Sequence, residues 1–166
     1  MANCCFYTLH AVSKSEKTLK RLLNIMNQTD NEYYIYRCDQ AVLENSYKDG
    51  EYFVYEISGD VAWSCSHWVG NTERNDDEHT LSNGAHYVSL DILAKRLDFA
   101  FEIYAEETGN QFQQHIVCDH NGSVQEDTAE WSQTWQDEDG NDLDEPVEDG
   151  GFGDEYCNFM TAEEVY

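Results

Sequence analysis

Strand-like and helix-like segments follow one another in a definite order along the first 125 residues of this chain, and that order narrows the possible folds to a small set. Cys4–Val12 is rich in aromatic and β-branched residues with a period near two, which predicts a strand with one covered face. Ser15 has the chemistry of a helix N-cap, and apolar residues then recur at steps of three and four up to Met26. Leu22 in this helix, and Leu93 in a later one, are expected to lie in the core.

Two aromatic segments come next, Tyr33–Cys38 and Glu51–Ile57, separated by a polar stretch that ends at Asp49-Gly50. We expect them to be strands that pair antiparallel across a loop of about a dozen residues. Val61–Cys65 is expected to extend the second strand. Residues 70–87 show no periodicity and are predicted to form a loop.

A second helix is predicted at Ser89–Leu97, then a strand at Phe99–Glu107, another at Gln114–Asp119 and a hairpin turn at His120-Asn121-Gly122. The resulting order is strand, helix, strand, strand, helix, strand. It predicts an α+β protein of the ferredoxin-like, split β-α-β type, with an antiparallel sheet, two helices on one of its faces and an added hairpin.

Charge divides the chain into two unequal parts. Residues 1–96 carry 14 acidic and 9 basic residues, whereas residues 97–166 carry twenty acidic residues and neither Lys nor Arg. Because most of the acidic excess lies in the second part, adaptation of the whole chain to high salt is disfavoured. We predict a ferredoxin-like domain over residues 1–125 and an acidic, aromatic-containing extension over residues 126–166.

The extension contains Trp131 and Trp135, four residues apart. On a helix this spacing would place both rings on one face, from which they could pin the extension to the sheet. The run from Asp137 to Gly151 is acidic and holds the only proline of the chain, so it is predicted to be mobile in isolation. The apolar residues among 152–166 are expected to dock back onto the domain.

Four short tracts carry a resemblance to a known family. They are the start Met-x-Asn-x-Cys with Asn3 and Cys5, the tract Val61-Ala62-Trp63-Ser64, the tract Tyr104–Gly109 and the turn Asp119–Gly122. Over residues 3 to about 125 the chain resembles the ferredoxin-like domain of YubB-type proteins of phages and plasmids. In that family prolines usually follow the Ala-Trp-Ser tract, where this chain has Cys65-Ser66. The family offers no activity that could be transferred to this chain. The resemblance implies a mobile-element origin, where small acidic proteins often act against host nucleases and other defence enzymes.

The charge pattern predicts the sign of the charge on the partner's binding surface. Carboxylates spaced along a surface present a potential similar to that of nucleic acid, so the chain should bind neither nucleic acid nor membranes and should attract basic nucleic-acid-binding proteins. We expect it to inhibit such a host defence enzyme, of CRISPR or restriction type, by occupying its basic groove as a nucleic-acid mimic. The candidate partner-binding residues are Glu106, Glu107, Asp119, Glu126, Asp127, Glu130, Trp131, Trp135, Asp137, Glu138, Asp139, Asp142, Asp144 and Glu145. The alternative is a non-catalytic adaptor of a mobile element that binds its partner through the aromatic residues of the extension.

Metal, cofactor and catalytic chemistry are not indicated. Cys65-Ser66-His67 and Cys118-Asp119-His120 offer ligand types that zinc prefers, but not at the Cys-x-x-Cys spacing of zinc sites. A calcium loop with Gly140 at its sixth position would have Trp135 and Pro146 at ligand positions, so its register fails. We therefore expect no catalytic residue, no metal and no cofactor.

The sequence also predicts a location. It begins without the pattern of a signal peptide, and no stretch reaches the roughly 20 apolar residues that a membrane helix needs. We expect a protein of the bacterial cytoplasm whose six cysteines are reduced thiols. Its oligomeric state is left open.

Overall fold

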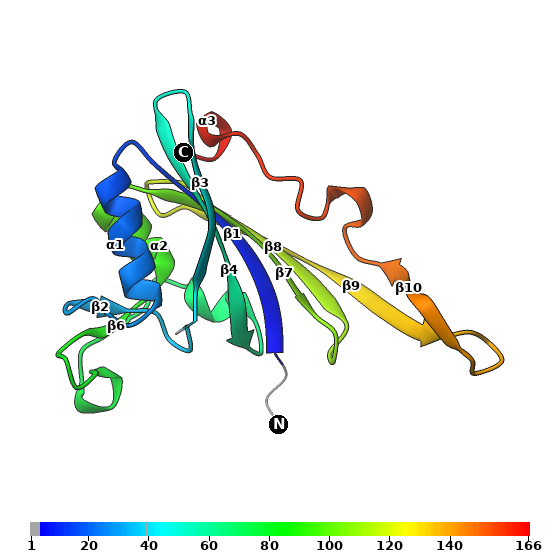
Figure 1. The fold of residues 1–166 in the computed structure, drawn as a ribbon. Helices are drawn as coiled ribbons and strands as arrows, with labels where there is room; N and C mark the ends of the chain where they lie inside the picture. The colour runs from blue at the N-terminus through cyan, green and yellow to red at the C-terminus, as the bar shows by residue number, and fades with distance from the viewer. Residues whose placement is uncertain (1–3, 39) are drawn as a thin grey trace.

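Seven strands form the main sheet of this protein, which is described by a computed structural model for residues 4–38 and 40–166. Their order is β10-β9-β8-β7-β1-β4-β3, and every neighbouring pair is antiparallel (Figure 1). The strands are β1 (Cys4–Ser13), β3 (Val42–Asp49), β4 (Tyr52–Ala62), β7 (Ala100–Glu107), β8 (Phe112–Cys118), β9 (Val124–Gln136) and β10 (Asp142–Gly150). The predicted α+β class and antiparallel sheet are confirmed. Asn3, part of the motif at the start of the chain, lies outside the described residues.

Strand β1 is an inner strand of the sheet, paired with β4 on one side and β7 on the other. Leu9 is fully buried and faces Ile57 of β4 on one side and Ile103 of β7 on the other. Alternate residues of β1 point to the two faces, so Leu9 faces the helices and Val12 faces the opposite side, where it packs in a separate cluster.

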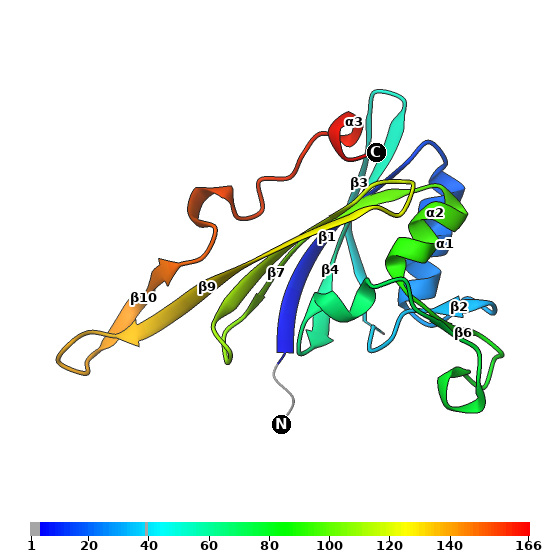
Figure 2. The ribbon, with the colours of Figure 1, turned by 180° about the vertical axis from the view of Figure 1, so that it is seen from behind.

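Two helices cover one face of the sheet, as predicted. They are α1 (Glu16–Met26) and α2 (Leu90–Leu97), which lie together on the same side of the sheet in Figures 1 and 2. The Ser15 side chain accepts a hydrogen bond from the Thr18 backbone N–H and caps α1. Leu22 and Leu93 are both fully buried, which confirms the two predicted core positions.

The partner of β4 differs from the prediction. The polar stretch expected to be a loop forms edge strand β3, and a tight turn at Gly50, with φ +60°, joins it to β4. Tyr33–Cys38 does not pair with β4, and only Tyr33–Tyr34 is a strand (β2). Both faces of β3 are largely exposed from Val42 to Lys48, so its sequence lacks the apolar alternation by which a half-buried strand is recognised.

Residues 70–87 are mostly irregular, as predicted, but they contribute to a second, small sheet. Its order is β2-β6-β5, with β5 at Glu73–Arg74 and β6 at His86–Val88. A 3₁₀ helix at Asp77–His79 lies between β5 and β6, and another at Cys65–Trp68 follows β4. Trp68 of the second 3₁₀ helix is fully buried, so this side structure is packed onto the core.

The C-terminal half departs further from expectation. Residues around Trp131 and Trp135 form the long strand β9 rather than a helix, and the acidic run forms β10, which pairs with it. The hairpin of β9 and β10 extends away from the helices and the rest of the sheet (Figure 1). The boundary predicted at residue 125 falls at the start of β9, and the division into a domain and an extension stays a prediction.

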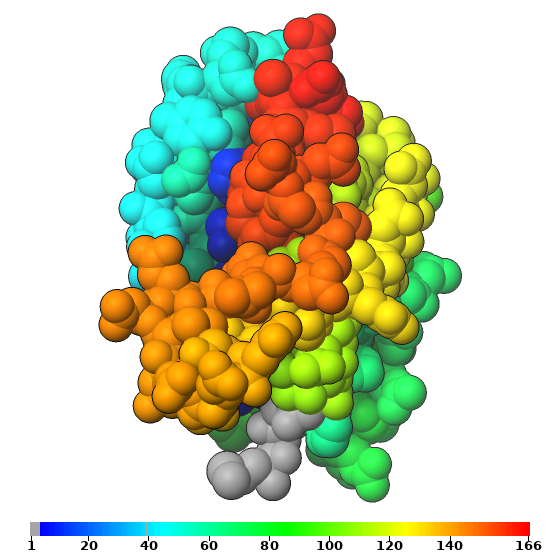
Figure 3. Space-filling view, turned by 90° about the vertical axis from the view of Figure 1, so that its right-hand side faces the viewer, coloured from blue at the N-terminus to red at the C-terminus, as the bar shows by residue number. Residues whose placement is uncertain are grey.

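The end of the chain crosses the face of the sheet opposite α1 and α2. Figure 3 shows this segment between β3 and β9, with part of β1 visible beside it. The ring of Phe159 stacks on His10, and Val165 of α3 (Ala162–Val165) packs with Val12 and Val54. The expected docking of the terminal apolar cluster is confirmed, so both faces of the central strands are covered.

Candidate protein-binding surface

The hairpin from Glu126 to Asp149, called the acidic arm below, gathers most of the predicted site residues. It contains eleven acidic residues and no Lys, Arg or His, and all eleven acidic side chains are exposed. They are Glu126, Asp127, Glu130, Asp137, Glu138, Asp139, Asp142, Asp144, Glu145, Glu148 and Asp149. None of these carboxylates forms an ion pair with a cationic side chain in the described part of the chain.

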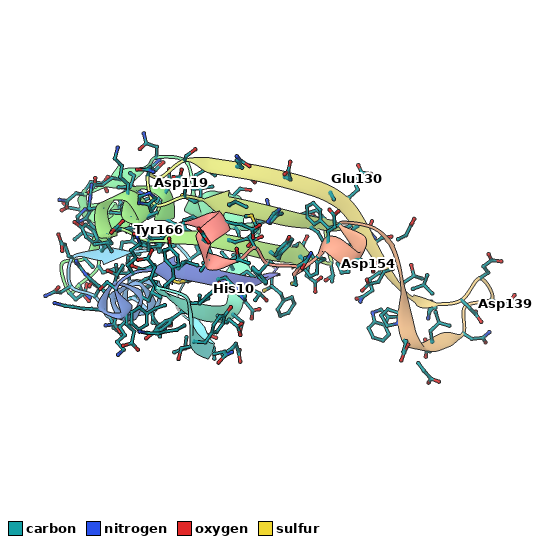
Figure 4. All side chains as sticks on the ribbon, turned by 90° about the horizontal axis from the view of Figure 1, so that it is seen from above. His10, Asp119, Glu130, Asp139, Asp154 and Tyr166 are labelled. Carbon is teal, nitrogen blue, oxygen red and sulfur yellow. The ribbon has the colours of Figure 1, made fainter. Side chains whose placement is uncertain are left out.

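The tip of the arm is a turn organised by one carboxylate. Asp137 accepts hydrogen bonds from the backbone N–H groups of Asp139 and Asn141, both at 2.9 Å, and from the Asn141 side chain. The hydrogen bond from the Asn141 amide is the largest cause that lowers the pKa of Asp137. Asp137 therefore stays charged, and its hydrogen bonds organise the turn in which Asp139 lies at the end of the arm (Figure 4).

Strand β10 forms the outer edge of the arm and is interrupted. Its register against β9 shifts between Asp142 and Val147, a stretch that includes Pro146. Proline lacks a backbone N–H, and irregular edge strands resist pairing with further strands. This edge is therefore suited to contacts made by side chains rather than to extension of the sheet.

The base of the arm is fixed by Trp131. Its side chain is 3% exposed, and its backbone N–H donates to the Gln111 carbonyl at 2.9 Å. Gly151 lies against Trp131 and Gln113 with φ +71°, so closely that a Cβ atom there would collide with both side chains. Trp131 therefore connects the arm to the main sheet and is not available to a partner.

In the outer part of the arm, the large apolar side chains are exposed on both faces of the hairpin. Trp135 is 54% exposed and points to the same face as Trp131, while Val147, opposite Thr134, is 61% exposed on the other face. The indole N–H of Trp135 donates to the Gln133 side chain at 3.3 Å. A two-stranded hairpin without a covered face is only marginally stable, so the tip gains most from contact with a partner.

Three predicted site residues lie outside the arm. Glu107 is 1% exposed, and its carboxylate accepts the backbone N–H groups of Gly109 and Asn110 in the β7–β8 turn. Asp119 organises the β8–β9 turn through the N–H groups of Asn121 and Ser123, at the opposite end of the molecule from Asp139 (Figure 4).

Glu106 is the third of these residues. It lines a small cavity of 220 Å³ between β7 and the start of the C-terminal segment, beside Trp131 and Tyr156. Burial raises the pKa of Glu106. Its carboxylate therefore contributes less to an exposed charged surface than the carboxylates of the arm do.

Sequence reasoning missed two acids that belong to the surface. Glu148 and Asp149 are exposed on β10, opposite Gln133 and Ser132 of β9. They belong to the same acidic run, residues 137–151, as the predicted site residues Asp137 to Glu145, and this continuity in sequence could have identified them. Their position on the arm follows only once the run is known to be a strand.

The ion pairs after residue 97 are made by histidine. Glu102, 1% exposed, contacts His115 at 2.7 Å, and Asp98 contacts His120 at 3.2 Å. Across the described ranges 4–38 and 40–166, no group of three His, Cys, Asp or Glu side chains is arranged to hold a metal ion. In those ranges there is also no helix with the length and apolar character that crossing a membrane requires.

Searches of protein-family models, of curated proteins and of solved structures found no match to this chain.

Proposed function

We propose that this chain is a non-catalytic inhibitor that occupies the basic nucleic-acid groove of a host defence enzyme, of CRISPR or restriction type, by imitating nucleic acid. The observation that supports this proposal is the acidic arm, with eleven exposed carboxylates and no cationic side chain. Charges that are not neutralised within their own molecule remain available to attract a partner, and the attraction weakens as salt rises. A basic groove is the surface that such an arm complements.

The charge density of the arm favours imitation of a single strand over a duplex. β9 from Glu126 to Gln136 spans roughly 35 Å at about 3.3 Å per residue. Eleven charges over that length are spaced by about 3 Å, close to the value of about 3.4 Å for one nucleic-acid strand and twice the spacing of a duplex. The partner groove is therefore one that holds a single strand, or one strand of a hybrid.

The origin proposed for the chain agrees with its topology. Within the sheet, the order β7-β1-β4-β3 with α1 and α2 on one face supports a ferredoxin-like core, to which β8, β9 and β10 are added. Such a core is what the resemblance to YubB-type proteins implies. We accordingly place the protein in the bacterial cytoplasm, as the product of a phage or plasmid.

The test begins with capture of the partner from a bacterial host lysate at two salt concentrations. The captured enzyme is then loaded with labelled DNA or RNA, and displacement of the label by the protein is measured. We expect displacement that weakens as salt rises, and no binding of the labelled strand by the protein alone.

Charge reversal identifies the surface responsible. Glu138, Asp144 and Glu145 are exposed on the arm without side-chain hydrogen bonds in the described structure, so changing them to Lys should leave the fold intact. We expect displacement to weaken by about tenfold or more, which corresponds to about 1.4 kcal/mol. The matched control reverses Asp77, Glu78 and Glu163, exposed acids away from the arm, and should retain its potency. Equal potency of the two triple variants would refute the proposal.

One observation favours the adaptor as a second candidate. Trp135 exposes more than half of its surface at the outer part of the arm, and aromatic anchors of this kind often dominate protein interfaces. If the protein is an adaptor, Trp135→Ala should abolish partner capture while the charge-reversed arm retains it. If it is a nucleic-acid mimic, charge reversal should weaken partner capture more than Trp135→Ala does.

A further inference from the structure

A cavity of 410 Å³ lies beside the small sheet, and its lining residue Ser66 donates a hydrogen bond to Glu126 at the base of the acidic arm. It is framed by the turn that follows β2, by the 3₁₀ helix at Cys65–Trp68, and by β5 and β6; β2 and β6 are seen below α1 and α2 in Figure 2. The side chains that line it include Tyr36, Arg37, His67, Arg74, His79 and Tyr87. Its volume is within the range of pockets that hold small molecules.

The cavity is lined by basic side chains although the chain as a whole is strongly acidic. The sequence has 34 acidic and only nine Lys and Arg residues, yet two arginines and two histidines line this space and no Asp or Glu does. Two nearby carboxylates contact the lining: Asp76 contacts His79 at 2.7 Å, and Glu126, the first acidic residue of the acidic arm, accepts a hydrogen bond from Ser66.

The arginines of the cavity differ from the other two arginines of the chain. Arg21 pairs with Asp30 and Glu32, and Arg96 pairs with Glu73 through both of its terminal nitrogens. By contrast, neither of the two arginines that line the cavity forms an ion pair with a carboxylate in the described ranges.

Each of these two arginines contacts an aromatic or imidazole ring instead of a carboxylate. The guanidinium of Arg37 lies 4.9 Å from the centre of the Tyr36 ring. The Nη1 atom of Arg74 lies 3.2 Å from Nε2 of His79, whose Nδ1 contacts Asp76. A guanidinium that lacks a carboxylate retains its capacity to bind a phosphate through paired hydrogen bonds.

The aromatic wall of the cavity is built to keep its shape. The buried Trp68 donates its indole N–H to the Tyr36 carbonyl at 3.0 Å, and Tyr87 donates its hydroxyl to the His67 carbonyl at 3.1 Å. Tyr36 packs edge-on against Tyr87 and still exposes 41% of its surface. Arg37 adopts a left-handed backbone conformation with φ +58°, which residues other than glycine seldom adopt without support from their surroundings.

We propose that this cavity binds a nucleoside phosphate, with the phosphate between Arg37 and Arg74 and the base against the exposed ring of Tyr36. Guanidinium groups without carboxylate partners recognise the phosphate, and an exposed aromatic ring stacks on a base of any sequence. The inference is independent of the inhibitory function because neither the cavity nor its arginines belong to the acidic arm.

Titration calorimetry on the unaltered chain tests this proposal, with the four ribonucleoside monophosphates, adenosine and inorganic phosphate as probes. We expect at least one monophosphate to bind with one-to-one stoichiometry and at least about tenfold more tightly than both adenosine and inorganic phosphate. Absence of measurable binding by all four monophosphates, or equal affinity for adenosine and its monophosphate, would overturn the proposal.

Variants test which residues bind the phosphate and which bind the base of the ligand. Arg37→Gln and Arg74→Gln should each weaken monophosphate binding about tenfold or more, whereas Tyr36→Ala should weaken monophosphate binding but leave that of inorganic phosphate unchanged. Lys17→Gln, which removes one exposed positive charge from α1, is the matched control and should bind as the unaltered chain does. Melting curves verify that each variant is folded. If an arginine variant does not fold, the ranking of probes on the unaltered chain still decides the outcome.

Discussion

The ring of Phe159 lies flat on the imidazole of His10, with ring centres 3.6 Å apart and planes inclined by 8°. His10 belongs to the inner strand β1, and Phe159 to the segment that crosses the sheet. Nearby, the buried Glu102 accepts the Met160 backbone N–H at 2.8 Å through one oxygen and contacts His115 through the other. One aromatic stack and one buried carboxylate thus hold the C-terminal segment to the sheet.

Truncation of this stack is predicted to destabilise the protein. Phe159 is partly buried, so Phe159→Ala should lower the free energy of unfolding by about 2 kcal/mol through lost burial and ring contact. Denaturant melts measure the change. Phe6→Ala removes a phenyl ring that is 53% exposed on the same strand as His10, and should change stability by no more than about 0.5 kcal/mol. Equal losses in the two variants would contradict the proposed role of the stack.

Stability is predicted to depend on pH through His10. Burial is the largest influence on this residue and lowers its pKa, against the opposing attraction of Glu56 and Glu102. The unfolded chain then binds a proton more readily than the folded chain, so stability is present above the ordinary histidine pKa of about 6.5 and is lost as pH falls through the folded value. Unfolding free energies measured from pH 7.5 to pH 5 should show a weaker decline in His10→Gln than in the unaltered chain. Parallel declines would exclude His10 as the cause.

Two adjacent glutamates are predicted to respond oppositely to the same substitution. Burial raises the pKa of Glu106, so its charge opposes folding at neutral pH, and Glu106→Gln should stabilise the protein at pH 7. The charge-related cost of Glu106 is absent below the ordinary glutamate pKa and develops as pH rises through the folded value, so this gain should vanish near pH 4.

The neighbouring Glu107 is the matched comparison. Its carboxylate accepts two backbone N–H groups, and Glu107→Gln leaves only one oxygen to receive them. We expect a loss of about 1–3 kcal/mol at pH 7. Thermal and denaturant melts of the two variants at pH 7 and pH 4 measure both effects, and a shared direction of change at pH 7 would contradict the assignment.

The two tryptophans of β9 are predicted to have different roles, Trp131 in the stability of the fold and Trp135 in binding a partner. Trp131→Ala should destabilise the protein by about 3–5 kcal/mol because its side chain is buried at the base of the arm. Trp135→Ala should leave the melting temperature nearly unchanged because more than half of the ring is already exposed. Melting curves decide the first point. Partner capture by the Trp135 variant then reports on recognition without interference from unfolding.

The elements that could be predicted from the sequence are those in which one face is buried and the other is exposed. The alternation in β1 and the three-and-four spacing that places Leu22 in the core record such one-sided burial, so strand, helix and core positions follow from them. The count of charges after Arg96 likewise predicts an acidic surface, because most carboxylates without cationic neighbours remain in water.

The remaining features depend on which segments pair in space. β3 is exposed on both faces and therefore leaves no periodic signal, and the spacing of Trp131 and Trp135 fits one face of a strand as well as one face of a helix. Arg37 and Arg74 line one cavity only because β2 and β5 both pair with β6. The sequence by itself determined the local periodicity and the charge of this protein, whereas the tertiary structure decided strand order and the residues that meet at a site, since those follow from contacts between segments distant in the chain.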